Sequence, residues 1–141
     1  MTPRQHSATK HVMRLQHSIL SVLAAGMISG CMDRIPPTSL TQTRMHVTKR
    51  RILQYARSHN QLPPDLASLP PMSGFDTSIV DGWKRSLTYQ TNSAGIVTLL
   101  SLGRDGVRGG SGEDADIERS FNAYDARGTW SDESIDWRRS P

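Results

Sequence analysis

The stretch Ile96-Val97-Thr98-Leu99-Leu100-Ser101-Leu102 decides the fold, because it is the most strand-like segment of this 141-residue chain. Its β-branched and aliphatic side chains suit the pleated surface of a strand. Residues 86–90 have the same character, and the turn-forming residues 92–95 separate the two segments. We therefore predict an antiparallel hairpin over residues 86–102.

Upstream of the hairpin, residues 38–58 have the spacing of an amphipathic helix. The apolar residues on or near one face are Met45, Ile52, Leu53 and Ala56, with Tyr55 beside them. Thr38 or Ser39 is expected to cap the helix, because its side-chain oxygen can accept a first-turn N–H. Asn60 is expected to end the helix before the prolines that follow.

Three consecutive basic residues, Lys49, Arg50 and Arg51, stand in the middle of the predicted helix. They fall away from the apolar face, so we expect them on the solvated side. Contact with anionic lipid is the alternative, given an anchor nearby in the sequence.

The remaining segments complete an α+β fold class. Residues 117–122 are expected to add a last short strand to the hairpin. Residues 125–141 contain Trp130 and Trp137 but little else that is apolar, so we expect a loosely packed C-terminal tail. The predicted architecture is one long N-terminal helix packed on a small antiparallel sheet.

The beginning of the chain has the pattern of an export signal. Residues 18–28 are apolar and uncharged, and basic residues precede them. A bilayer-spanning helix needs about 20 apolar residues, so this shorter segment fits a signal-peptide hydrophobic region instead. The following Ile28-Ser29-Gly30-Cys31 resembles the bacterial lipobox, in which the cysteine receives diacylglycerol. Both Met1 and Met13 are candidates for the start.

These patterns divide the chain into four parts. We expect a lipoprotein signal peptide over residues 1–30, lipidated Cys31 with a tether over 31–37, a globular domain over 38–124 and the tail over 125–141. Acyl chains on Cys31 would hold the domain at a membrane surface, facing the periplasm. Met32, rather than an aspartate, follows the cysteine, and by resemblance to enterobacterial sorting this favours the outer membrane.

The net charge of +4 does not indicate a nucleic-acid-binding protein. Three basic residues precede the apolar segment, and removing them from the 17 leaves 14 basic against 13 acidic residues. No strong positive field remains for DNA or RNA. Cys31 is the sole cysteine, so the chain has no internal disulfide.

Residues 103–116 form a long glycine-rich loop that gathers carboxylates. The four acidic residues are Asp105, Glu113, Asp114 and Asp116, and five glycines allow the backbone to bend tightly. Ca²⁺ needs about 6–8 oxygen ligands at flexible angles, which carboxylates and loop carbonyls provide. Neutralisation of the same carboxylates by Arg104 and Arg108 is the alternative.

No catalytic arrangement emerges from the sequence. After the export segment only His46 and His59 remain, both on the predicted helix, and neither belongs to a zinc-binding set. No nucleophile–base pair and no small-molecule substrate is indicated. We therefore predict a binding or structural module and not an enzyme.

Four short motifs carry a family resemblance, in order, from about residue 40 to residue 117. They are Asn60-Gln61-Leu62-Pro63, Asp81-Gly82-Trp83-Lys84, Ser101-Leu102-Gly103-Arg104-Asp105-Gly106 and Asp114-Ala115-Asp116-Ile117. The chain resembles the C-terminal domain of the major (G-type) pseudopilin of type II secretion systems. It departs from that family in having a lipobox where pseudopilins have a prepilin-peptidase site, and in Gly82 where a proline is usual.

The resemblance implies one Ca²⁺ ion bound by the loop. The side chains implied are Asp105, Asp114 and Asp116, with the carbonyls of Leu102 and Val107, and Glu113 as a further candidate. The implied function is a lipid-anchored, calcium-stabilised pseudopilin-like module in the bacterial envelope. It would be accessory to type II secretion or a related pilus-like machine. An envelope lipoprotein that uses this domain for an unrelated structural or binding role is the alternative.

Overall fold

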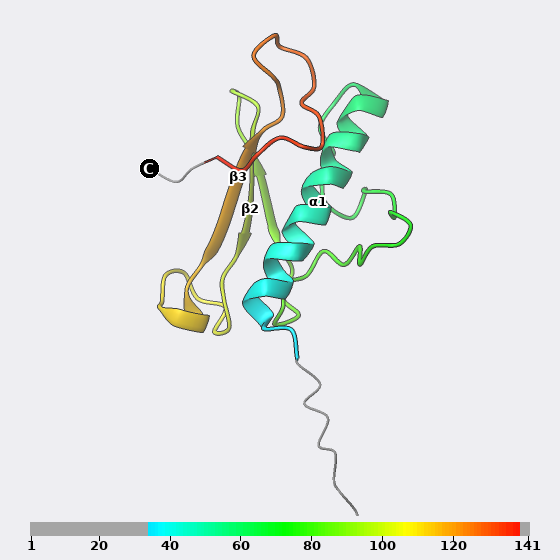
Figure 1. Ribbon diagram of the computed structural model, residues 1–141. Helices are drawn as coiled ribbons and strands as arrows, with labels where there is room; N and C mark the ends of the chain where they lie inside the picture. Colours follow the sequence, from blue (N-terminus) through cyan, green and yellow to red (C-terminus); the bar gives the residue numbers. More distant parts are fainter. Residues whose placement is uncertain (1–33, 139–141) are drawn as a thin grey trace, which may run out of the picture. The chain divides into compact units, whose positions relative to one another are not determined.

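The computed structural model describes residues 34–138, and they belong to one compact unit, Asp33–Pro141 (Figure 1). Helix α1 (Pro37–His59) comes first, followed by strands β1 (Thr88–Thr91) and β2 (Ile96–Ser101). A short 3₁₀ helix, η1 (Gly112–Asp114), precedes strand β3 (Ile117–Asn122). The predicted signal peptide and Cys31 lie outside the described residues.

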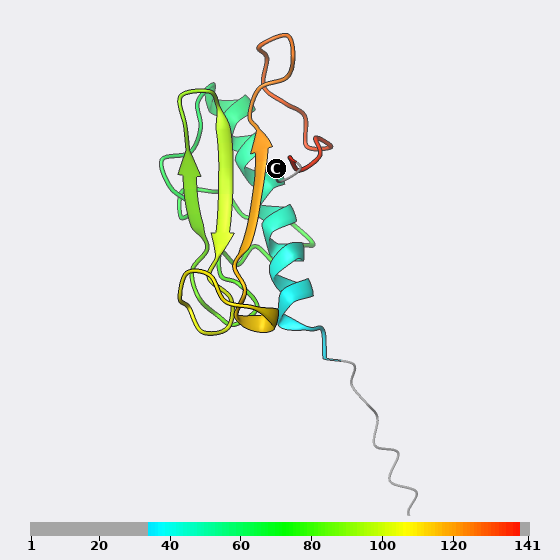
Figure 2. The ribbon, with the colours of Figure 1, turned by 90° about the vertical axis from the view of Figure 1, so that its left-hand side faces the viewer.

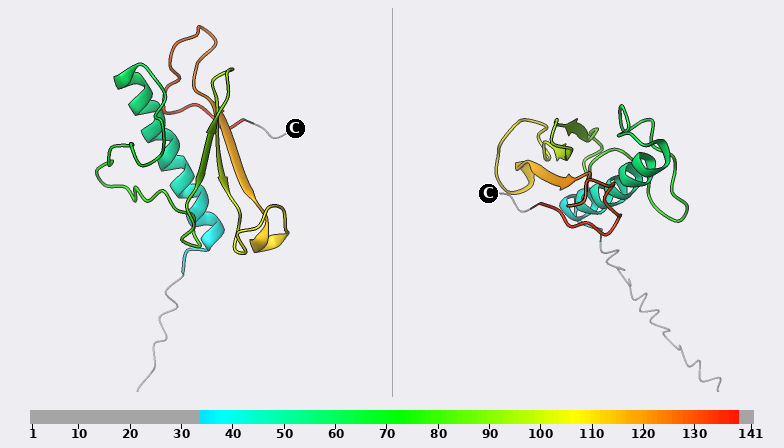
Figure 3. Two further views of the ribbon diagram at one scale, coloured as in Figure 1. Left: turned by 180° about the vertical axis from the view of Figure 1, so that it is seen from behind. Right: turned by 90° about the horizontal axis from the view of Figure 1, so that it is seen from above.

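The three strands form one antiparallel sheet in the order β1-β2-β3. In its register Leu99 lies opposite Tyr89 on one side and Arg119 on the other, and Val97 lies opposite Phe121. Helix α1 runs along one face of this sheet (Figures 2 and 3). The α+β fold class and the helix-on-sheet architecture are therefore confirmed, as are the hairpin and the last short strand.

The core lies between α1 and the sheet, where the sequence pattern places it. Met45, Ile52 and Leu53 of the helix are fully buried, as are Val97 and Phe121 of the sheet. Burial of each such side chain contributes roughly 1.5–3 kcal/mol. Side chains of one helix face and one sheet face thus account for most of the packing.

The prediction for the start of α1 is wrong, and the prediction for its end is confirmed. The N-cap is Pro36, with Pro37 at the first helical position and no side-chain capping hydrogen bond, so the prediction of a Thr38 or Ser39 cap is wrong. Proline suits that position because its missing N–H has no partner inside a helix and its φ is preset. At the other end, Asn60 takes the left-handed conformation (φ 53°) and ends the helix as predicted.

The prediction of a solvated basic side on α1 is wrong for two of its three residues. Lys49 is 2% exposed and Arg51 is 4% exposed. The Arg51 guanidinium donates hydrogen bonds to the carbonyls of Leu69 (2.7 Å), Pro70 (2.8 Å) and Thr77 (2.8 Å). Burial lowers the pKa of Arg51. The side chain is buried because it satisfies carbonyls of the loop that crosses α1.

Lys49 connects the helix to the C-terminal segment in the same way. Its ammonium donates a hydrogen bond to the carbonyl of Ile135 and lies 5.0 Å from the centre of the Trp137 ring. Desolvation lowers the pKa of Lys49, and the nearby Asp136 carboxylate opposes that shift. The hydrophobic stem of Lys49 is thereby buried while its charge keeps two partners.

The expectation of a loosely packed tail is wrong for residues 125–138. Trp137 meets Phe121 edge to face, with ring centroids 5.7 Å apart. The backbone N–H of Arg138 donates to Ser120, and that of Ser131 donates to Ala123. These bonds run along the free edge of β3, and the Trp137 indole closes that side of the core.

Candidate functional site

The acidic loop 103–116 lies at the end of the domain where α1 begins, as Figure 2 shows. The turn at residues 81–85 connects the two. The N–H of Gly82 donates to the Thr41 hydroxyl at 2.8 Å, and a Cβ on Gly82 would overlap the carbonyl of Pro37. Only glycine fits against the helix start there, so Gly82 belongs to the packing of this end.

A buried carboxylate joins that turn to the loop. Asp81 is fully buried, and its Oδ1 accepts hydrogen bonds from the N–H groups of Trp83 and Arg85, both at 2.9 Å. Its Oδ2 accepts the Ser101 hydroxyl at 2.7 Å, and that hydroxyl oxygen in turn accepts the N–H of Gly103 at 3.3 Å. This chain of bonds fixes the point where β2 ends and the loop begins.

The loop closes on the backbone of Asp114. Gly103 has φ 64°, and a Cβ there would lie 2.7 Å from the Asp114 carbonyl oxygen. The N–H of Arg104 donates to Glu113 at 2.8 Å, and the N–H of Asp116 donates to Gly109 at 3.1 Å. The left-handed backbone and the close approach both require glycine at position 103.

The predicted side-chain ligands have different partners in the structure. Arg104 donates to the Asp114 carboxylate at 2.9 and 3.1 Å and to Glu113 at 3.0 Å. These ion pairs raise the pKa of the Arg104 guanidinium, chiefly through Asp114. The Asp105 carboxylate instead accepts the N–H of Val107 at 3.0 Å.

Among the predicted ligands, Asp116 has a carboxylate oxygen that accepts no hydrogen bond. Its Oδ1 is buried and has no hydrogen-bond partner, while its Oδ2 lies 3.5 Å from the Arg108 guanidinium. A buried carboxylate oxygen without a donor is costly, and a hard cation is one kind of partner that would satisfy it. The Asp116 side chain thus fits a calcium-binding role.

The predicted ligands do not gather around one point. Within residues 34–138, no three acidic, histidine or cysteine side chains converge as a metal-binding group. The physical reason is that Arg104 holds Asp114 and Glu113, which is the alternative neutralisation that the sequence left open. The donor set still suits a hard cation, because it offers carboxylate and carbonyl oxygens only.

Sequence reasoning missed the supports of this loop. Asp81 was named only within a family motif, and Ser101 only within a motif and the predicted strand, without a role for either in the loop. Arg85 also contributes, because its guanidinium donates to the Gly103 carbonyl at 3.3 Å. The signal that could have identified Asp81 is an aspartate two residues before Trp83, the spacing of an Asx turn.

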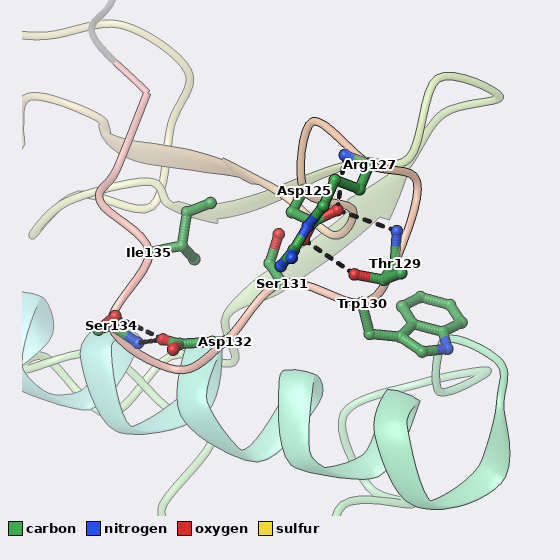
Figure 4. Close-up of a pocket in the computed structure, with 8 residues that line it drawn as sticks. All are labelled: Asp125, Arg127, Thr129, Trp130, Ser131, Asp132, Ser134 and Ile135. Atoms are coloured by element: carbon green, nitrogen blue, oxygen red, sulfur yellow. Dashed lines mark hydrogen bonds and ion pairs between the residues drawn. The ribbon is translucent and has the colours of Figure 1, made fainter.

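A hollow of about 310 Å³ lies at the opposite end of the domain from the acidic loop (Figure 4). Asp125 lines it and accepts bonds from Arg127 and from the N–H and hydroxyl of Thr129. These bonds lower the pKa of Asp125 to about 2. Ser131 also lines the hollow, is 1% exposed and has no partner for its hydroxyl. The Asp125 carboxylate is already satisfied by its own turn.

A long helix on a three-stranded antiparallel sheet, with a glycine-rich acidic loop between the last two strands, defines a pseudopilin-like domain. The profile of the family described as "Type II secretion system (T2SS), protein G" matches residues 42–120, more than half of the chain. The chain belongs to this family, as the resemblance in the sequence motifs predicted. No curated protein and no solved structure was found to match it. Among the described helices, none is long and apolar enough to cross a membrane.

Proposed function

We propose that this chain is a lipid-anchored, calcium-stabilised pseudopilin-family module of the bacterial envelope, accessory to type II secretion or a related pilus-like machine. The observation that carries the proposal is the family match over residues 42–120, which spans the entire acidic loop. The family is structural and not catalytic, which agrees with the absence of a catalytic pattern in the sequence.

Calcium is the proposed stabiliser of the loop. The Asp116 carboxylate, with its unsatisfied buried Oδ1, is its proposed primary ligand, and Asp105 and Asp114 would complete the side-chain set. The carbonyls of Leu102 and Val107 would supply further oxygens, with Glu113 as an alternative side chain. The ion would neutralise carboxylates that otherwise repel one another and would stabilise the folded loop through its binding free energy.

The lipid anchor is proposed from Ile28-Ser29-Gly30-Cys31, which lies outside the described residues. Acylation of Cys31 would hold the domain at a membrane surface without a spanning helix. We therefore propose a periplasm-facing module at a membrane surface, with the outer membrane favoured by Met32. Its proposed partners are membrane lipid and components of the secretion machine.

Palmitate incorporation tests the anchor. Cells expressing the full chain are expected to label it with radioactive palmitate, and Cys31→Ala is expected to abolish the label. Equal labelling of the two chains, or none of either, would remove the lipoprotein proposal. Cys31→Ala is the matched control, because it removes the sulfur and leaves the rest of the export segment intact.

Affinity purification tests the secretion role. The acylated chain, crosslinked in cells that have a type II secretion system, is expected to capture components of that system. The control is Cys31→Ala, which is not acylated and is expected to capture fewer of these components. Capture of none of these components would favour an unrelated structural or binding role in the envelope.

A further inference from the structure

One end of the domain carries exposed apolar and basic side chains together. We call it the anchor-side surface, and its members are Arg34, Ile35, Lys84, Arg104, Val107 and Arg108. Ile35 and Val107 are each 62% exposed, the highest values among the large hydrophobic residues of the described chain. The Arg104 and Arg108 side chains are 57% and 67% exposed.

These residues come from three segments that the fold holds at one end. The chain enters at Arg34 and Ile35, directly before α1, and the acidic loop lies beside the start of α1 in every view (Figures 1, 2 and 3). The turn that contains Lys84 packs on Pro37 through Gly82 and on the loop through Asp81 and Ser101. The surface is therefore set by the rigid part of the fold.

The length of chain outside the structure identifies what this surface faces. Arg34 is three residues after Cys31, and three extended residues span roughly 10 Å. If Cys31 carries acyl chains, Arg34 lies at most about 10 Å from that anchor, which is close to the Debye length of ≈ 8 Å at physiological salt. Charges at that separation still interact with the charged lipid headgroups, because salt screens them only partly.

The charge of this end depends on the loop. The basic side chains are Arg34, Lys84, Arg85, Arg104 and Arg108, and the acidic ones on the turn, the loop and the start of β3 are Asp81, Asp105, Glu113, Asp114, Asp116 and Glu118. Five positive and six negative charges leave this end with a net charge of −1, so it has no net attraction for anionic lipid. One bound Ca²⁺ would give it a net charge of +1 and would leave arginines that now pair with carboxylates free for phosphate.

We propose that the anchor-side surface is a calcium-dependent docking surface for anionic phospholipid headgroups, with Ile35 and Val107 entering the interface and the basic side chains contacting phosphate. This inference rests on the proposed function, since it requires the anchor at Cys31 and calcium in the loop. It also proposes an orientation of the domain: the first turn of α1 faces the membrane, and the segment 125–138 lies on the side away from the membrane. Binding of this end to a protein is the competing outcome of the test.

The test uses the full acylated chain in vesicles, with an environment-sensitive fluorophore attached at Val107→Cys. The matched control is Ser93→Cys, an exposed position in the turn at the opposite end of the sheet. Vesicles are phosphatidylcholine alone or phosphatidylcholine mixed with phosphatidylglycerol, each with Ca²⁺ or with a chelator. A blue shift at position 107 only with phosphatidylglycerol and Ca²⁺, and none at position 93, is the expected result.

Charge variants test the headgroup contact. Arg34→Gln is expected to lower the docked-to-undocked ratio roughly fivefold, which corresponds to about 1 kcal/mol per basic residue near the surface. Arg127→Gln is the control, because Arg127 is 85% exposed at the other end. A probe at 107 that stays in water on anionic vesicles with Ca²⁺, or that shifts equally on phosphatidylcholine, would overturn the proposal.

Failure of the underlying function gives a different result. If Cys31 is not acylated, the wild-type chain itself takes up the thiol-reactive fluorophore, whereas an acylated chain does not. Suppose that the wild-type chain does not react with the dye and is stabilised by Ca²⁺. An unshifted probe at position 107 would then refute the docking surface alone. Dye uptake by wild type would refute the anchor instead.

Discussion

The Asp81 carboxylate accepts the Ser101 hydroxyl at 2.7 Å, in a place where Asp81 is fully buried. This bond joins the turn after the long crossing loop to the last residue of β2. Because Ser101 also accepts the N–H of Gly103, the entrance of the acidic loop depends on a residue twenty positions earlier. The acidic loop is thus stabilised by Asp81, a residue that lies outside it.

Removal of the Asp81 side chain is expected to destabilise the whole domain. Asp81→Ala leaves three donors without their acceptor, among them the buried Ser101 hydroxyl, and we expect the free energy of unfolding to fall by about 3 kcal/mol. Urea unfolding followed by circular dichroism measures it. Asp65→Ala is the control, since Asp65 bonds only Ser68 in an exposed turn. Equal losses from the two variants would show that burial of Asp81 adds nothing.

The C-terminal segment is expected to behave as part of the fold. Trp137 is partly buried against Phe121 and Lys49, so Trp137→Ala should lower the free energy of unfolding by about 2 kcal/mol. Limited proteolysis should then cut the segment 125–138 earlier than in wild type. Arg127→Ala, at an exposed position, should change neither. An unaltered cleavage pattern in Trp137→Ala would instead support the expectation of a loosely packed tail.

Tyr89 is expected to make the domain sensitive to alkali. Burial raises the pKa of Tyr89 to about 12 from the model-compound value of 10.0, and its hydroxyl donates to the Pro63 carbonyl at 3.0 Å. A raised pKa means that the folded state disfavours ionisation, so this contribution is complete below pH 10 and is lost as the pH rises toward 12. Tyr89→Phe should flatten the fall in stability over that window, measured by urea unfolding at successive pH values. A fall of the same steepness in Tyr89→Phe would assign it to other groups.

Arg104 and Ca²⁺ are expected to compete for the same carboxylate. Arg104 pairs with Asp114, one of the proposed ligands, so Arg104→Gln should raise the affinity for Ca²⁺ modestly and lower the stability measured in chelator. Isothermal titration measures the affinity. Arg127→Gln breaks a comparable exposed pair with Asp125 and should leave Ca²⁺ binding unchanged. Weaker binding in Arg104→Gln would mean that Arg104 supports the ion.

The fold followed from local patterns that the sequence displays directly. Met45, Ile52 and Leu53 repeat at helical spacing, and all three are fully buried. The strand-like stretch from residue 96 forms β2 in the centre of the sheet, the position that its apolar composition favours. Asn60 ends the helix because asparagine tolerates the left-handed backbone.

The misjudged residues depend on partners far away in the chain. Lys49 and Arg51 have the side chains of a solvated helix face, yet their charged groups satisfy carbonyls 18 to 86 residues later. The same holds for Trp137, which packs because β3 has a free edge that the C-terminal segment covers. A loop forms where the glycines and acids predict one, but its dependence on Asp81 is a tertiary relationship that no local pattern contains.

The central claim is that the loop is a calcium site, and thermal unfolding of the acylated chain in detergent tests it most directly. Wild type, Asp105→Ala and Asp116→Ala are compared in Ca²⁺ and in chelator. At a Ca²⁺ concentration about a hundredfold above the dissociation constant, binding should stabilise wild type by ≈ 2.7 kcal/mol. We predict a clear rise in the wild-type midpoint that both variants lose. A wild-type midpoint that is the same in Ca²⁺ and in chelator would contradict the calcium site.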